Sequence, residues 1–385
     1  MRSATVVLAL LIATGPPSTA TWQGSSLQSS DRSSDPTPLY RVSFERRDAV
    51  AGLNSTPAVR LPFKCTSDGT IFATFVGSVP ANSGLLPPLI PPLQFVSVRP
   101  PERGVVFRLD QVPELFVSRE IDHYPSDSEV VFLVLASREN KPEKRTVSWG
   151  KEGGKREYTT NAAEQHPYIV SFSRDGKYKH TVEIDDDFSI QHLGVFPSGT
   201  LLAFGFDKSD HSPKLAMLKE DGTLLKYVEI SKGDTPDSMV GGRDSPRRGV
   251  LAQSELVPEG RSIFIVQNKT TFPVLEVSEG GTIRAIHPKL LKGEQTEAAI
   301  PSDRSLYVIA SPETMERGSA GVIYEVNPED GSLLRRFELT AGREASDVAC
   351  IHEGKFLSLD YGDGKVVPLI GSVEPANVSQ QKSLH

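Results

Sequence analysis

The sequence predicts an all-β fold, a six-bladed β-propeller built from four-stranded antiparallel blades. Three observations predict it: a strand–turn–strand unit recurs six times, a second hairpin follows five of these units, and one strand near the N-terminus has no neighbour in sequence. The 31 Gly and 29 Pro among 385 residues suit a chain with many turns. A β-sandwich also has evenly spaced strands. It does not require the same two turn types to alternate six times, so the propeller is favoured.

Residues 1–20 have the features of a cleaved signal peptide. Arg2 precedes a mostly apolar run, Ala4–Ala13, and small residues follow at Ser18-Thr19-Ala20. The apolar run is well short of the roughly 20 residues that a membrane span requires, which makes a membrane anchor the weaker interpretation. We therefore expect a secreted or periplasmic protein without a transmembrane span after signal removal. Residues 21–38 are polar and are expected to be a disordered spacer.

The first hairpin of each unit has a Pro, Ser, Asp or Gly turn between two apolar strands. The six copies are FKCTSDGTIFATF from Phe63, HYPSDSEVVFLVL from His123, VFPSGTLLAFGF from Val195, LVPEGRSIFIVQ from Leu256, AIPSDRSLYVIA from Ala299 and CIHEGKFLSLDY from Cys350. Five are followed by a second hairpin, with turns at Glu102-Arg103-Gly104, Asp175-Gly176, Asp221-Gly222, Gly280-Gly281 and Asp330-Gly331. Glycine is common in such turns because its backbone tolerates a positive φ angle. Two hairpins give the four strands of a blade.

The last unit lacks an outer strand. After Lys355–Tyr361 and the turn at Gly362–Gly364, only KVVPLIGS remains before a polar stretch, residues 373–385, that we expect to be a disordered tail. The isolated LYRVSFE at Leu39–Glu45 is similar to the outer strand LLRRFEL. We expect it to pair with Lys365–Gly371 and close the ring, so that the propeller spans residues 39–372.

The two cysteines occupy equivalent positions in the first and last units. Cys65 and Cys350 each lie four residues before a turn glycine. Export permits a disulfide, and closing so long a loop would stabilise the fold. Equivalent residues of neighbouring blades point in the same rotational sense, however, and a disulfide needs Cα atoms within about 7 Å. Two buried free thiols are the favoured prediction, with a disulfide as the alternative.

The long connections all fall on one face of the predicted propeller. They are the Pro-rich Gly77–Leu93, the charged Arg138–Gln165 and the Gly-rich Ser231–Gly249. Because long loops often carry binding, this face is predicted to bind a protein, a peptide or a glycan. Arg138–Glu157 has a mild positive excess that suits an acidic partner, although a solvated loop is the commoner outcome. The net charge of −7 argues against nucleic acid.

Polar residues alternate with apolar ones along the innermost strands. Strand alternation directs the polar set toward the central channel: Glu120, Asp122, His192, Gln253, Glu255, Thr296 and Asp347. The carboxylates of Glu120 and Asp347 could bind Ca²⁺ or Mg²⁺, or clustered charges could serve as general acid or base. A water-filled channel with solvated side chains is the alternative. The familiar GxSxG, P-loop and HExxH motifs do not occur.

The units PSGTLLAF, PEGRSIFIV and NPEDGSLLRRFEL resemble repeats of six-bladed propellers of the NHL-repeat and TolB-like group. That resemblance implies either a binding module or a metal enzyme, since the group includes protein, peptide and glycan binders, lactonase-like enzymes and lyases. In lactonase-like members Glu, Asn and Asp surround an axial metal, and Glu120 and Asp347 match the acids. We expect a non-catalytic binding module without a cofactor. The alternative is a metal-dependent hydrolase or lyase acting at the channel.

Overall fold

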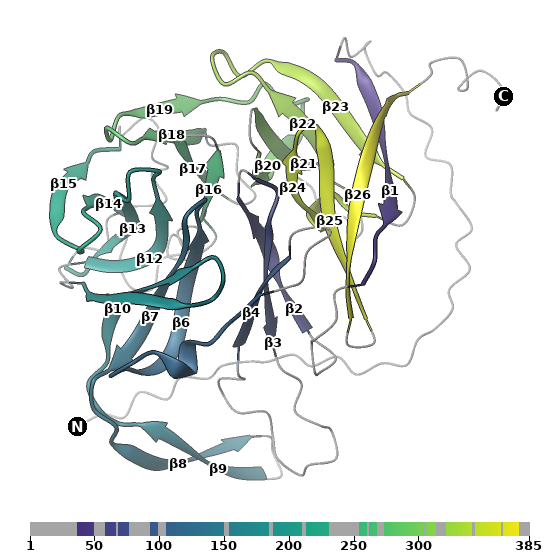
Figure 1. Cartoon of the computed structure of the whole chain (residues 1–385). Helices are drawn as coiled ribbons and strands as arrows, with labels where there is room; N and C mark the ends of the chain where they lie inside the picture. The colour runs from purple at the N-terminus through teal and green to yellow at the C-terminus, as the bar shows by residue number, and fades with distance from the viewer. Residues whose placement is uncertain are drawn as a thin grey trace. The chain divides into compact units, whose positions relative to one another are not determined.

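The computed structural model describes residues 37–49, 58–66, 68–76, 93–98, 105–149, 154–184, 188–209, 213–230, 254–259, 262–267, 273–302, 305–312, 321–340, 343–362 and 365–376. The chain divides into two compact units, Met1–Pro36 and Thr37–His385, and every described residue belongs to the second unit. The described elements are strands and short 3-10 helices (Figure 1). Among the described residues there is no helix long and apolar enough to cross a membrane.

The strands form four separate four-stranded sheets, one eight-stranded sheet and a two-stranded ribbon. The first sheet contains β2 (Ala58–Cys65), β3 (Ile71–Val76), β4 (Leu93–Val98) and β5 (Val105–Phe107), and the second contains β6 (Phe116–Pro125), β7 (Glu129–Ser137), β10 (His166–Ser173) and β11 (Tyr178–Glu183). The third contains β12 (Phe188–Val195), β13 (Leu201–Asp207), β14 (Pro213–Leu218) and β15 (Leu224–Val228), and the fourth contains β16 (Ser254–Glu259), β17 (Ser262–Gln267), β18 (Val274–Ser278) and β19 (Ile283–Ile286).

The eight-stranded sheet joins the last two repeat units. It contains β20 (Glu294–Ile300), β21 (Leu306–Pro312), β22 (Val322–Val326), β23 (Leu333–Leu339), β1 (Leu39–Arg46), β26 (Lys365–Pro375), β25 (Lys355–Gly362) and β24 (Val348–His352), in that order. Within each repeat unit, neighbouring strands pair antiparallel, as the two-hairpin pattern predicts.

The hairpin turns have the backbone geometry that their glycines predict. In the turn before β13, Phe196 N donates to Thr200 O (2.8 Å) and Gly199 N donates to Phe196 O (2.9 Å). The turn before β15 repeats both bonds around Gly222. Gly199 and Gly222 have φ values of 86° and 79°, a region that side chains disfavour. The same turn chemistry therefore recurs in different sheets because the same residue types recur in the sequence.

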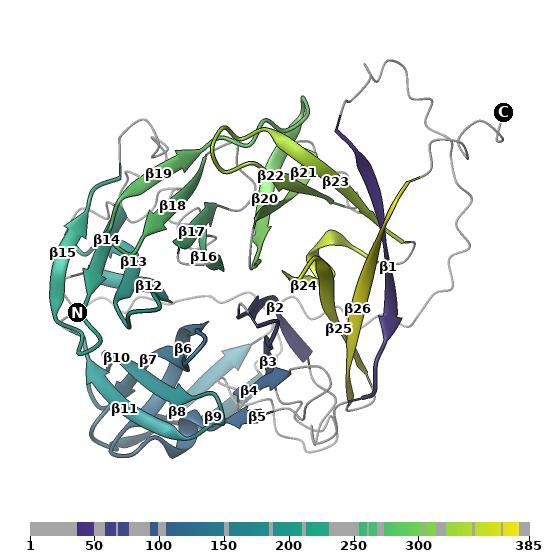
Figure 2. The same ribbon diagram turned by 45° about the horizontal axis from the view of Figure 1, so that its top comes forward.

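The first strand of each repeat unit contacts the first strand of the next. These contacts run from β2 to β6, β12, β16, β20 and β24, and β24 in turn contacts β2. Figure 2 shows these strands on the inner side of their sheets. Because the sequence of contacts returns to β2, residues near the two ends of the described chain lie side by side.

Strand β1 links the last two repeat units. It pairs antiparallel with β26, with Ser43 opposite Ser372 and Glu45 opposite Ile370, and parallel with β23. Pairing of Leu39–Glu45 with the C-terminal strand agrees with the sequence prediction. Strand β26 continues through Pro375, three residues beyond the predicted boundary at Ser372. A Cβ atom on Gly371 would lie 2.8 Å from Val42, so only glycine allows β1 this close an approach.

The cores lie between neighbouring sheets. Phe107 of the first sheet packs against Phe132 and Phe172 of the second, with ring centroids 5.9 and 6.0 Å apart. Val42 of β1 is fully buried in a cluster with Phe337 and Phe356. These contacts bury the alternate apolar residues that identify the strands in the sequence.

Part of the predicted charged loop Arg138–Gln165 is instead a hairpin. Strands β8 (Pro142–Trp149) and β9 (Gly154–Asn161) pair antiparallel as a two-stranded ribbon between β7 and β10. The β-forming residues Thr146, Val147, Tyr158 and Thr159 explain this hairpin. Of the other two predicted long connections, Ser231–Gly249 lies outside the described residues, as does Gly77–Leu93 except for Leu93, which begins β4.

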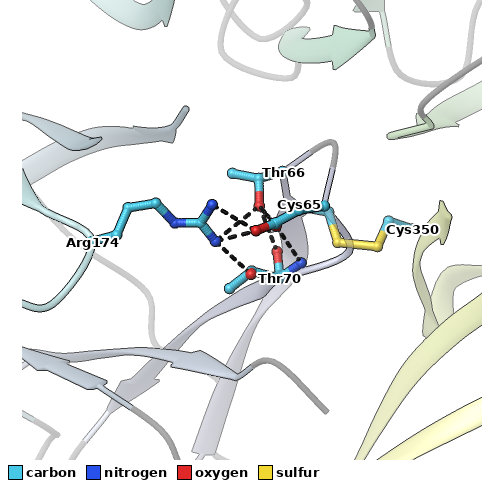
Figure 3. The surroundings of a disulfide bond; sticks show 6 residues. Cys65, Thr66, Thr70, Arg174 and Cys350 are labelled. Carbon is cyan, nitrogen blue, oxygen red and sulfur yellow. Dashed lines mark hydrogen bonds and ion pairs between the residues drawn. A yellow bond between two sulfur atoms is a disulfide. The ribbon is translucent and has the colours of Figure 1, made fainter. Parts of the chain in front are cut away.

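The prediction of two free thiols is wrong, because Cys65 and Cys350 form a disulfide. Their Cα atoms are 5.9 Å apart, within the range that a disulfide spans. The orientation argument failed because the inner strands β2 and β24 contact each other directly, which brings equivalent positions within bonding distance. Figure 3 shows the bond joining the first sheet to β24.

Candidate functional site

A cavity of about 220 Å³ lies where the first turns of the repeat units meet. We call it the turn pocket. Its lining comes from five repeat units: Cys65, Thr66, Tyr124, Pro125, Ser126, Asp127, Ser128, Val195, Phe196, Pro197, Ser262, Ile263, Pro301 and Ser302. Five chain segments, far apart in the sequence, therefore form one site.

The lining residues follow from the repeated turn sequence. Tyr124-Pro125-Ser126, Phe196-Pro197-Ser198 and Ile300-Pro301-Ser302 each end an inner strand and begin its turn. The aromatic side chains of Tyr124 and Phe196 are each 1% exposed, and proline supplies rigid apolar surface beside them. The β8–β9 ribbon, the part of the long connections that the structure describes, follows β7 at the end of that strand opposite to its first turn. The pocket is therefore on the side of the molecule that the sequence analysis did not select for binding.

An arginine from the second sheet holds the turn that follows Cys65. Arg174 donates two hydrogen bonds to the Asp68 carboxylate, at 2.8 and 3.1 Å, and one to Thr70 Oγ1 at 2.5 Å (Figure 3). Burial alone would raise the pKa of Asp68, but the hydrogen bonds from Arg174, Thr66 and Thr70 outweigh burial and hold that pKa well below its usual range. We call these contacts the Arg174–Asp68 clamp. They hold the pocket wall at Thr66, on the side opposite the disulfide.

A buried polar network lies one to three residues before the pocket-lining residues on β2, β6 and β12. Lys64 Nζ donates to Asp122 Oδ1 at 2.5 Å and also to the main-chain oxygen of His123. The other Asp122 oxygen accepts a hydrogen bond from Leu193 N at 3.1 Å, and His192 Nδ1 lies 3.5 Å from it. Asp122 thus links three sheets.

The charge of Asp122 is stabilised by its neighbours. Burial would raise the pKa of Asp122, but the Lys64 ammonium and the hydrogen bond from His192 lower it well below its usual range. Asp122 is therefore ionised at neutral pH. Asp122 contacts Nδ1 of the His192 ring. The other ring nitrogen, Nε2, is buried and has no hydrogen-bond partner among the described residues.

The structure places the remaining predicted channel residues in separate settings. Glu120 is buried, with Oε1 3.3 Å from His123 Nδ1. Thr296 is buried in β20, and the Asp347 carboxylate accepts a hydrogen bond from Glu344 N at 3.0 Å in the 3-10 helix η3 (Ala345–Asp347). Gln253 lies outside the described residues, and only the backbone of Glu255 is described, in β16.

The strict alternation assumed for the inner strands is interrupted. The pairing register shifts beside Ile121 in β6, beside Gln191 in β12 and beside Glu297 in β20. A β-bulge adds one residue to one strand, and every residue beyond it changes face. For this reason, period-two counting does not direct the whole predicted set to one surface.

The predicted metal ligands that the structure describes lie in separate places. Within the described ranges, no group of three or more His, Cys, Asp or Glu side chains is arranged to hold a metal ion. Glu120 contacts His123, and Asp347 caps η3. The predicted set also includes Gln253 and Glu255, whose side chains are not described, so metal binding stays a prediction.

Sequence reasoning missed Lys64 and Arg174. Lys64 lies five residues before its turn glycine, the same position as Asp122 in the next unit, so the same alignment could have identified it. Equivalent positions of neighbouring inner strands meet, as the disulfide also shows. Arg174 lies in a second-hairpin turn and carries no comparable signal. Its role depends on the contact between the first and second sheets.

No protein-family model matches this chain, and no curated protein sequence is similar to it. Solved structures with similar folds include virginiamycin B lyase from Staphylococcus aureus, at 11% identity and a TM-score of 0.38, covering 85% of this chain and 99% of that one. The WD40 domain of Neurospora crassa Pan2 aligns at 11% identity and a TM-score of 0.34, covering 80% and 87%. These neighbours are β-propeller-type proteins. At such scores they carry no argument about function.

Proposed function

We propose that this chain is an exported, six-bladed β-propeller that works as a binding module, with its ligand in the turn pocket. The closed sequence of contacts among the six inner strands supports the blade count. The β1–β26 pairing supports closure of the ring by an N-terminal strand. The disulfide supports export, because such bonds persist mainly in oxidising compartments.

The observation that carries the binding function is the turn pocket itself. Ligand sites are concave, mostly apolar and furnished with a few polar groups. The turn pocket combines buried aromatic and proline surface with hydroxyl groups and a carboxylate. Its walls are fixed by the Arg174–Asp68 clamp and by the disulfide. A preformed site of this kind binds a ligand at a low cost in conformational entropy.

A thermal-shift screen of small polar and amphipathic compounds tests this function. Exposed Ser128 lines the pocket, so Ser128→Trp should fill it and remove the stabilisation that a pocket ligand gives the wild type. Ser209→Trp, at another exposed serine outside the pocket, is the matched control. Hits that stabilise both variants equally would show that the ligand binds elsewhere.

On the face that the long connections predict to bind a partner, the structure describes the ribbon β8–β9. The ribbon β8–β9 projects from the second sheet, and residues 141–146 are all exposed. Residues 141–161 contain six Lys or Arg and three Glu, a net charge of +3 in a chain of −7. Deleting residues 142–160 should weaken the capture of an acidic partner protein. An unchanged set of partners would count against this face.

Hydrolysis is the second candidate function. Asp122 beside His192 Nδ1 is the arrangement that orients an imidazole as a general base. If the site is catalytic, ester or lactone hydrolysis should fall at least 100-fold in His192→Gln.

Metal analysis, with thermal shifts in Ca²⁺, Mg²⁺ and Zn²⁺, tests the predicted role of Glu120 and Asp347. A Glu120→Ala, Asp347→Ala double variant that still responded to metal would exclude these two ligands.

A further inference from the structure

The disulfide Cys65–Cys350 lies at the wall of the turn pocket. Cys65 is one of the described residues that line the pocket, and Cys350 is not. Both cysteines are nearly fully buried, at 1% and 2% exposure, in a cluster with the apolar side chains of Leu357 and Leu359. A molecule inside the turn pocket therefore meets the disulfide at Cys65 and not at Cys350.

The reaction that a disulfide in this position offers to a small molecule is thiol–disulfide exchange. A thiolate attacks one sulfur of a disulfide, and the other sulfur leaves. Attack from the pocket forms a bond between the incoming sulfur and Cys65 Sγ and breaks the bond between Cys65 Sγ and Cys350 Sγ. The Cys350 thiolate leaves and takes up the proton that the incoming thiol has released to water. The incoming sulfur is thereby oxidised to a mixed disulfide, and the sulfur of Cys350 is reduced to a thiol.

The size of the pocket and the rigidity of its wall limit this reaction to small thiols. A volume of about 220 Å³ is below the roughly 300–1,000 Å³ of pockets that take drug-sized molecules. Because Cys65 is 1% exposed, the wall beside it must also move before a thiolate can reach its sulfur. Thr66 forms that wall, and its Oγ1 donates to Asp68 Oδ1 at 2.7 Å within the Arg174–Asp68 clamp. The clamp should therefore restrict how often the disulfide is reached.

We propose that Cys65 is a site of reversible thiolation, at which a small aliphatic thiol enters the turn pocket, opens the disulfide and stays bound to Cys65. This inference rests on the proposed function, since the adduct occupies the space of the pocket ligand and so regulates the same site. The Cα atoms of the two cysteines are 5.9 Å apart. The released Cys350 thiol is therefore close enough to attack the adduct, expel the small thiol and restore the disulfide.

The test follows the opening of the disulfide by 2-mercaptoethanol in the folded, full chain. Free thiols are blocked with N-ethylmaleimide at each time point, and peptide mass spectrometry locates the adduct. We expect the first adduct on Cys65, with Cys350 alkylated. Because access sets the rate of exchange, Ser128→Trp, which fills the pocket, should slow the opening by about tenfold or more. Ser209→Trp lies outside the pocket and should react at the wild-type rate.

A second pair of variants separates local access from unfolding. Asp68→Asn loosens the clamp beside Cys65 and should speed the opening by more than its loss of global stability predicts. Val42→Ala, which is destabilised away from the pocket, should not. Acceleration of both variants in proportion to their loss of stability would show that exchange requires global unfolding, and it would overturn the inference. An adduct on Cys350, or an unchanged rate in Ser128→Trp, would overturn it as well.

Thiolation and the proposed binding function can fail separately. A screen compound that stabilises the wild type but not Ser128→Trp, in a chain whose Cys65 forms no adduct, would overturn thiolation and leave the pocket function standing. An adduct on Cys65 in a chain that no screen compound stabilises would support thiolation and count against the binding function.

Discussion

At the scale of single residues, the ion pair Lys64–Asp122 is buried between two sheets. Both side chains are 11% exposed, and the pair joins the first sheet to the second. Removing water from two charges is costly, and the cost is recovered only when they meet each other and further hydrogen-bond partners. Here Leu193 N, His192 and the main-chain oxygen of His123 supply those partners. The pair therefore depends on three strands being in register.

Removing one member of the Lys64–Asp122 pair should destabilise the fold more than replacing both members with apolar residues. Asp122→Asn leaves the Lys64 ammonium buried without its counter-ion, and we expect a loss of about 3–5 kcal/mol in the free energy of unfolding. The double variant Lys64→Met, Asp122→Leu should lose less than Asp122→Asn alone. Urea unfolding of the wild type, Lys64→Met, Asp122→Leu and the double variant measures the coupling. Additive losses would show that the two side chains do not interact.

Asp68 should make part of the stability depend on pH. Because the pKa of Asp68 is lowered in the folded state, the ionised carboxylate stabilises the fold above the unfolded pKa of about 3.9. This contribution is lost as the pH falls below that value and the carboxylate becomes protonated. The stability difference between the wild type and Asp68→Asn should therefore be largest near neutral pH and shrink toward about pH 2. Urea unfolding at several pH values measures it, and a constant difference would contradict the clamp.

At the scale of elements, β1 determines how the last two repeat units are joined. It pairs with β23 on one side and β26 on the other, so neither strand has an unpaired edge there. Val42 anchors β1 in the core between Phe337 and Phe356. The glycine at 371 lets the strand approach closely. Without β1, the backbone groups of β23 and β26 would lose hydrogen-bond partners.

A cavity created at Val42 should weaken the packing of β1 between β23 and β26. Val42→Ala removes buried methyl groups, and we expect a loss of about 2 kcal/mol in the free energy of unfolding. Protection of the β23 and β26 amides against hydrogen exchange should fall more than that of the β12–β15 amides, because β1 pairs with β23 and β26 in the eight-stranded sheet. Exposed Arg41→Ala is the control on the same strand. A uniform fall across all sheets would contradict a local role for β1.

At the scale of the whole molecule, two connections bring the first and last repeat units together. Strand β1 joins the repeat units of β20–β23 and β24–β26, and the disulfide joins β24–β26 to the first sheet over 285 residues of sequence. A covalent link over so long a loop removes many unfolded conformations. The last repeat unit is therefore connected to the preceding unit through β1 and to the first unit through the disulfide. The turn pocket takes residues from five units, so its shape depends on these two connections.

Loss of the disulfide should therefore affect stability and the pocket together. We expect the Cys65→Ser, Cys350→Ser variant to lose about 2–5 kcal/mol in the free energy of unfolding. Cys65 lines the pocket, so binding of compounds found in the thermal-shift screen should weaken as well. Reduction of the wild type under native conditions, followed by thermal unfolding with and without such a compound, checks the variant. Unchanged stability would show that β1 alone secures the closure.

Several features could be predicted from the sequence because they depend on local chemistry. Asp-Gly and Pro-Ser turns and alternating apolar runs are encoded within about a dozen residues, and they gave the strands, the two hairpins of most units and the pairing of β1. Asp122 and His192 were found in this way. The assumed alternation could not reveal the bulges beside Ile121 and Gln191, which depend on pairing with the next strand.

Neighbouring residues set backbone conformation, and for this reason the all-β class, the repeat and the turns follow from the amino-acid sequence alone. Three contacts could be known only from the folded chain: Cys65 bonds to Cys350, Lys64 pairs with Asp122, and Arg174 pairs with Asp68. The folded chain also shows that the cavity lies on the side of the short turns. The reason is distance: these partners are separated by 58 to 285 residues, and contacts at that range are fixed by how whole sheets pack around one another.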